Sequence, residues 1–224
     1  MPNDLGLGSG WAEHAQPPDA AAELGTFMGG VIDGTIQAVP LVWRRLSALT
    51  QCLMPGCVVV LCGAPGASKS LMALQLMHDL HVRGERVAML ALEGECRDVS
   101  GRLLAQLARC SAMTSLEWIK ANPARVRDAL AEHTPALASF GARVKTPGAL
   151  ADYDGVLGWV RERLAQEDRV LLIDPVTAAA PDREPWTADR HFLLDAKRLV
   201  SDAGASLIVV THPKKGGTPQ PSLD

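Results

Sequence analysis

Residues 58–70 read VVVLCGAPGASKS, and this stretch decides the fold. Its first half is apolar and β-branched, which is typical of a buried strand, and its second half is a loop of small residues ending on Lys69 and Ser70. The pattern directly after it predicts an amphipathic helix over 71–82. A strand, a small-residue loop and a helix N-terminus in this order form a phosphate site, because loop N–H groups and the helix dipole point at the anion.

The loop matches the nucleotide-binding pattern G-x-x-x-x-G-K-[ST] at Gly63, Lys69 and Ser70, whereas Ser68 stands where the second glycine belongs. In this pattern the lysine reaches the outer phosphates and the hydroxyl binds Mg²⁺. The Cβ of Ser68 lies where close backbone approach is wanted. An ordinary strand–turn–helix with a surface lysine is the alternative. We expect ATP and Mg²⁺ to bind along the loop, at Gly63, Ala64, Pro65, Gly66, Ala67, Ser68, Lys69 and Ser70.

Length and composition set outer limits on the function. The 224 residues suffice for one α/β domain with a full core, and the net charge of −3 gives no global argument for nucleic-acid binding. The chain begins MPND, without the basic and apolar regions of a secretory signal. No apolar run approaches the roughly 18 residues that a membrane span needs. We therefore expect a cytoplasmic protein with no membrane partner.

Three of the five cysteines, Cys52, Cys57 and Cys62, are evenly spaced, which suggests a metal site. Cys57 and Cys62 lie at the two ends of one predicted strand, about 16 Å apart and on opposite faces. One zinc ion cannot bridge that separation. Buried, reduced thiols are the prediction.

The chain divides into a tail and one core. Residues 1–25 are rich in Pro, Asp, Ala and Gly without periodicity and are predicted to be a flexible tail; residues 26–224 are predicted to be the core. Helices are expected over 42–49, 71–82, 99–110, 125–132, 153–167 and 188–203, with Pro123 and Pro135 as breaks in the fourth region. Strands are expected over 58–62, 86–92, 142–145, 170–174 and 206–211. This alternation predicts an α/β fold with a doubly wound, mostly parallel sheet flanked by helices.

Polar residues follow three of these strands, and ligands of such sheets lie at the carboxyl ends of the strands. Asp174 suits a carboxylate that binds Mg²⁺, Glu93 suits a base for the attacking water, and His212 suits a contact to the γ-phosphate. Each has a structural alternative: a turn acid before a proline, a solvated acid and a packed histidine. Glu95 is a second candidate for the base. Lys69, Glu93, Asp174 and His212 are the predicted catalytic set, with Ser70 and Asp174 as metal ligands.

In these segments the chain resembles the RecA-like ATPases, and among them the DnaB-like, RepA-like and Twinkle-like hexameric replicative helicases, which are AAA family ATPases. The likeness rests on a lead-in to the first strand, a Walker A loop, an "S-L-E…R-L" motif, a Walker B strand and a sensor strand, at 46–56, 63–70, 89–104, 170–175 and 207–216 respectively.

The resemblance implies a hexameric ring with ATP at subunit interfaces, single-stranded DNA in the channel and Glu93 as the catalytic base. It predicts the ATPase motor of a replicative DNA helicase, with Lys214–Lys215 as a candidate DNA loop. A KaiC-like or RadA-like ATPase in regulation or recombination is one alternative. A nucleotide-binding module with little turnover is another, because Ser68 departs from the pattern and the family continues beyond Asp224 to a further strand and an arginine finger.

Overall fold

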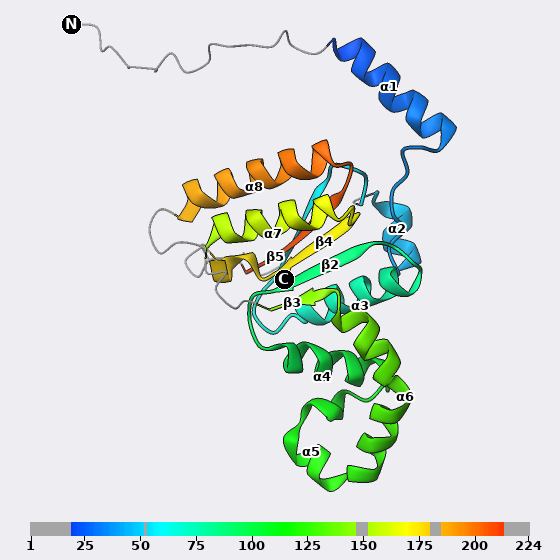
Figure 1. Cartoon of the computed structure of the whole chain (residues 1–224), viewed down its shortest axis with the longest axis vertical. Helices are drawn as coiled ribbons and strands as arrows, with labels where there is room; N and C mark the ends of the chain where they lie inside the picture. The colour runs from blue at the N-terminus through cyan, green and yellow to red at the C-terminus, as the bar shows by residue number, and fades with distance from the viewer. Residues whose placement is uncertain (1–18, 52, 147–151, 180–184, 213–224) are drawn as a thin grey trace, which may run out of the picture. The chain divides into compact units, whose positions relative to one another are not determined.

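A parallel five-stranded sheet forms the centre of the fold (Figure 1). The computed structural model describes residues 19–51, 53–146, 152–179 and 185–212. Within them the sheet has the spatial order β1-β5-β4-β2-β3, and every neighbouring pair is parallel. The strands are β1 (Val58–Cys62), β2 (Val87–Ala91), β3 (Val144–Lys145), β4 (Val170–Asp174) and β5 (Ser206–Thr211). The predicted α/β fold with a parallel sheet is therefore confirmed.

Helices cover both faces of this sheet (Figure 1). One face carries α3 (Lys69–Val82) and α4 (Cys96–Leu107), and the other carries α7 (Tyr153–Ala165) and α8 (Pro185–Asp202). Alternate residues of each strand serve opposite cores: Leu172 packs toward α3, whereas Leu171 packs toward α7 and α8. Because β2 and β4 are buried along their whole length, their sequences are continuous apolar runs.

The register of the strands brings the predicted site residues to one edge. Ala91 pairs with Asp174, and Cys62 pairs with Thr211. Glu93 lies two residues beyond β2, the loop that starts at Gly63 follows β1, and His212 follows β5. The carboxyl ends of four parallel strands thus place these groups on the same rim.

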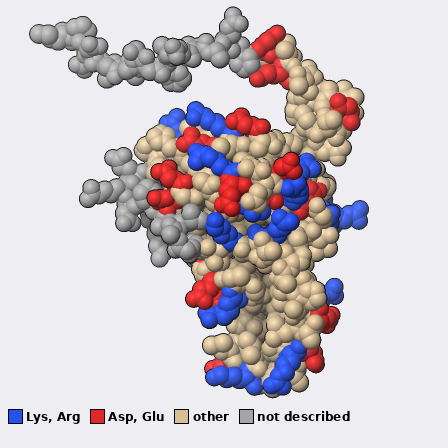
Figure 2. All heavy atoms as spheres, viewed as in Figure 1, with Lys and Arg blue, Asp and Glu red and all other residues tan. Residues whose placement is uncertain are grey.

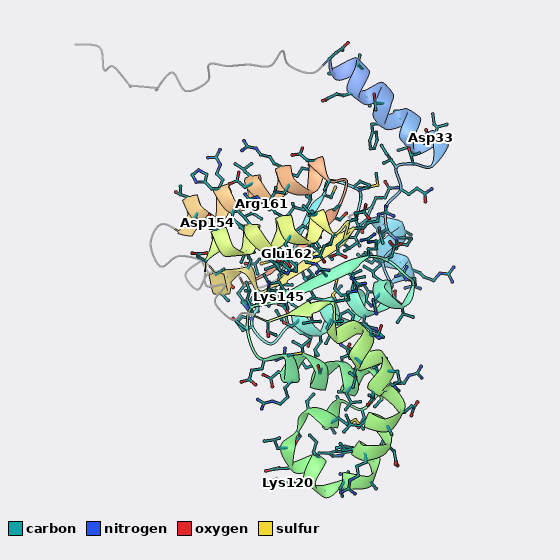
Figure 3. The ribbon with its side chains drawn as sticks, viewed as in Figure 1. Asp33, Lys120, Lys145, Asp154, Arg161 and Glu162 are labelled. Atoms are coloured by element: carbon teal, nitrogen blue, oxygen red, sulfur yellow. The ribbon has the colours of Figure 1, made fainter. Side chains whose placement is uncertain are left out.

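The remaining described helices are short or lie away from this rim. They are α1 (Ala20–Asp33), α2 (Arg44–Leu49), α5 (Leu116–Ala121) and α6 (Pro123–Gly141), with the 3-10 turns η1 (Ser111–Thr114) and η2 (Val176–Ala179). At the far edge of the sheet Lys145 of β3 forms an ion pair with Glu162 of α7 at 3.6 Å, and Figure 3 labels both.

Two helix boundaries differ from the prediction. Helix α4 begins at Cys96 rather than residue 99, because the Asp98 carboxylate accepts the Glu95 N–H at 3.1 Å and so caps the first turn. Pro135 does not break α6, which continues to Gly141. The backbone hydrogen bond lost at Pro135 is outweighed by burial of α6 on either side of it, through Ala129 and Phe140.

Residues 1–37 form a compact unit of their own, apart from 38–224. Its helix α1 begins at Ala20, where the Asp19 carboxylate accepts the Ala21 N–H at 3.0 Å. The tail predicted for residues 1–25 therefore overlaps a helix over residues 20–25, and residues 1–18 lie outside the described part of the chain. No described helix is long and apolar enough to cross a membrane.

The cysteines are free thiols, but the predicted burial is wrong for Cys62, which is exposed, and Cys57 is only half-buried. Within the described residues β1 is an edge strand, so its side chains lack cover on one side, and Val60 is 51% exposed. Cys52 lies outside the described residues. Among those described, no three His, Cys, Asp or Glu side chains gather to hold a metal ion.

Two histidines of α3 hold α6 through one aromatic ring. His78 and His81 contact Phe140 at centroid distances of 5.6 and 5.7 Å. Burial lowers the pKa of both histidines below the ordinary value of 6.5, with a further lowering from His81 at His78 and from Arg143 at His81. Both rings therefore favour the neutral form when the chain is folded.

This arrangement predicts a loss of stability in mild acid. The two rings stabilise the fold fully above pH 6.5, and that contribution is lost as the pH falls toward their lowered pKa values. The urea midpoint should therefore be lower at pH 5.5 than at pH 7.5, as measured by circular dichroism. A variant with His78→Gln and His81→Gln should lose most of the difference, whereas His191→Gln, at an exposed position, should keep it. An unchanged pH dependence in the double variant would contradict this role.

Candidate functional site

Lys69 is the centre of the rim. It is the first residue of α3 and is buried, with 6% of its surface exposed. Its ammonium donates to the carbonyls of Gly63 at 2.6 Å and Ala64 at 2.9 Å, and it lies 3.1 Å from Nδ1 of His212. A lysine ammonium has three donors and no acceptor, so Nδ1 of His212 accepts and the ring proton is on Nε2. All three donors of Lys69 are therefore used within the site.

A hydroxyl and a carboxylate meet beside this lysine. Ser70 Oγ donates to Asp174 Oδ1 at 3.2 Å, and Asp174 is buried with 6% exposure. Burial raises the pKa of Asp174; the hydrogen bond from Ser70 lowers it, and the charge of Glu93 raises it. A hydroxyl and a buried carboxylate are the hard oxygen ligands that Mg²⁺ prefers, so the residues present fit this ion.

Glu93 and Glu95 differ in how they are used. Glu93 is exposed and lines a small crevice together with Ser70, Asp174 and Arg102. Glu95 lies at the N-cap of α4 and forms an ion pair with Arg97 at 3.4 Å. Glu95 therefore has a structural use away from the crevice, which favours Glu93 as the acid that faces the site.

The loop between β1 and α3 adopts the shape that the pattern requires, at a cost. Ser68 has φ of 58° and Gly66 has φ of 82°, both in the left-handed region. Ser68 occupies the position where the pattern has glycine, and the reason for glycine there is this backbone conformation. The Ala67 N–H donates to the Ala64 carbonyl at 3.2 Å and closes the turn.

A cleft of about 700 Å³ opens from this loop. One end is polar and includes Lys69, Ser70 and His212, and the other is walled by Met113, Leu116 and Ile119 of η1, α5 and the segment between them. The apolar wall was not predicted, because residues 111–122 fold as two short helical turns with no sustained periodicity.

The structure brings Lys69, Ser70, Asp174 and His212 into direct contact, with Glu93 in the adjoining crevice. Pro65, Gly66, Ala67 and Ser68 form the exposed loop over them. The predicted DNA loop at Lys214–Lys215 lies outside the described residues. The face drawn in Figure 2 mixes acidic and basic side chains over the sheet domain and has no single basic patch.

This phosphate-binding loop and the parallel sheet define the chain as a P-loop ATPase domain. It belongs to the AAA domain family, whose sequence profile matches residues 35–218. No curated protein sequence matches it.

Two solved structures are similar to this chain. The first, titled ATPase domain of G40P, has a TM-score of 0.65 and 14% identity, covering 88% of this chain and 72% of that one. The second, a DnaB-like replicative helicase described with its primase interactions, has a TM-score of 0.68 and 14% identity. That alignment covers 88% of this chain but only 49% of the other, so this chain spans about half of that helicase. At this identity the likeness establishes the fold, which confirms the RecA-like architecture.

The strain at Ser68 generates a prediction. A β-branched residue at positive φ costs about 1–2 kcal/mol, whereas glycine is unstrained there. Ser68→Val should lower the free energy of unfolding by about that amount, measured by urea denaturation at pH 7.5. Ser68→Gly should leave it within about 1 kcal/mol of the wild type, because relief of strain offsets glycine's unfolded-state entropy. Equal stability of the valine variant and the wild type would show that the loop does not require the left-handed conformation.

Proposed function

We propose that this chain is the ATP-binding and ATP-hydrolysing motor domain of a DnaB/RepA-like hexameric helicase that acts on single-stranded DNA in replication. The observation that carries the ATPase part is the contact set of Lys69, Ser70 and Asp174 at the N-terminus of α3. Phosphate would lie over the loop, where the exposed N–H groups and the positive end of the α3 dipole favour an anion.

Each residue of the set has one proposed task. Lys69 would exchange its carbonyl acceptors in the loop for phosphate oxygens and neutralise their charge. Ser70 and Asp174 would hold Mg²⁺, which when bound offsets charge on the outer phosphates. Since burial penalises the charged form of Asp174, a cation beside it would be strongly favoured.

Glu93 and His212 would act on the terminal phosphate. Glu93 is exposed at the rim and would orient the attacking water and accept its proton. His212 bonds to Lys69 through Nδ1, which leaves the Nε2 proton available to a γ-phosphate oxygen. Loss of the γ-phosphate would therefore be felt at the end of β5, directly before residues 213–217.

The DNA part of the proposal is supported by the sequence resemblance and by the structural likeness to a DnaB-like replicative helicase. A KaiC-like or RadA-like ATPase with a different partner would use the same rim. A module with little turnover is favoured by one observation, the strained Ser68 in the loop.

Separate measurements of binding and turnover test the ATPase proposal. Lys69→Ala should lower ATP affinity at least tenfold, because it removes a charge-assisted contact to phosphate. Glu93→Gln should keep ATP affinity and lower kcat by about 10²-fold or more. Glu95→Gln is the matched control and should keep most of the turnover. Tight binding without turnover in the wild type would favour the inert module, and turnover that survives Glu93→Gln would exclude Glu93 as the base.

The helicase proposal has its own test. ATPase turnover of the hexamer should rise severalfold when single-stranded DNA is added and should respond less to duplex DNA, as measured by phosphate release at fixed ionic strength. Fixed salt matters because contacts to nucleic-acid phosphate weaken steeply as salt rises. Turnover that is the same with and without DNA would favour the KaiC/RadA-like alternative instead.

A further inference from the structure

Arg102 is the cation of the site that the tasks above leave unused. It lies on the exposed side of α4, nine residues after Glu93. Its side chain lines both the 700 Å³ cleft, with Lys69 and His212, and the small crevice, with Ser70, Glu93 and Asp174. It thus borders the two hollows that share Ser70.

The other cations of the cleft are already engaged. The Lys69 ammonium is saturated by two carbonyls and His212. Arg97 forms ion pairs with Glu95 at 3.4 Å and Asp98 at 3.6 Å. Among the described residues, no hydrogen bond or ion pair within 4.0 Å engages Arg102.

The position of the crevice indicates which phosphate Arg102 would meet. In the proposed site, the loop N–H groups hold the inner phosphates, and Lys69 and Ser70 reach outward from them. The terminal phosphate then lies toward the acids that act on it, Glu93 and Asp174, which line the crevice with Arg102. ADP has no group at that position.

We infer that Arg102 is a ligand of the γ-phosphate, supplied by the same chain that holds the nucleotide. This inference rests on the proposed ATPase function. A guanidinium presents several N–H donors in a plane and can bind two oxygens of one phosphate, which a lysine cannot do. Arg102 would make the site prefer ATP over ADP and would stabilise the charge that builds on the γ-phosphate during transfer.

The alternative for Arg102 is a surface pair with Asp98, one helical turn before it on α4. The Asp98 carboxylate is already bonded by the Glu95 N–H and paired with Arg97. An exposed pair of this kind would affect helix stability slightly and would not distinguish two nucleotides. A measurement of nucleotide preference therefore separates the two roles.

The test is equilibrium binding with Mg²⁺ by calorimetry, using a non-hydrolysable ATP analogue and ADP. Arg102→Ala should weaken the analogue about tenfold or more and change ADP affinity by less than about twofold. Arg102→Lys should recover part of the loss. Arg127→Ala removes the same charge from an exposed position on α6 and should leave both affinities unchanged.

Each outcome decides the matter. Retained analogue affinity in Arg102→Ala, or an equal loss for both nucleotides, would overturn the γ-phosphate assignment while the ATPase proposal stands. An equal loss in Arg127→Ala would show that the effect is one of overall charge and would overturn it too. If the wild type binds neither nucleotide, the proposed function itself fails, and the inference fails with it.

Discussion

The hydrogen bonds of the Lys69 ammonium are the interaction on which the site depends. A buried ammonium is costly unless its donors are satisfied, and Gly63, Ala64 and His212 satisfy them. This requires the loop after β1 and the end of β5 to lie side by side. The parallel pairing of the two strands, with Cys62 opposite Thr211, provides that. The rest of the fold can be understood as the support for this one edge.

Two separate apolar cores hold the edge in place. Strands β2 and β4 are buried on both faces, so Asp174 and the chain leading to Glu93 emerge from a rigid base. The backbone continues this support beyond the strands, because the Leu92 N–H donates to the Asp174 carbonyl at 2.7 Å. Flexible parts of the site are confined to the exposed loop over Lys69, where Ser68 stores backbone strain.

Strand positions and rim residues were predictable from the sequence because buried parallel strands are unbroken apolar runs, and their ends carry the polar groups. Pro135 misled, because proline disfavours a helix locally while the burial of Phe140 decides α6 globally. Cys62 misled because burial depends on which strand lies at the edge, which composition does not contain. The apolar wall at Met113 and Leu116 left no periodic signal to find.

Hydrogen–deuterium exchange of this chain, with and without ADP and Mg²⁺, tests the central claim most directly. If phosphate lies over the loop ahead of Lys69, the backbone N–H groups of residues 64–70 should exchange more slowly with nucleotide, since they would donate to it. The segment from Leu92 to Glu95 should follow. Unchanged exchange at residues 64–70, with protection only in α5 and α6, would contradict the account.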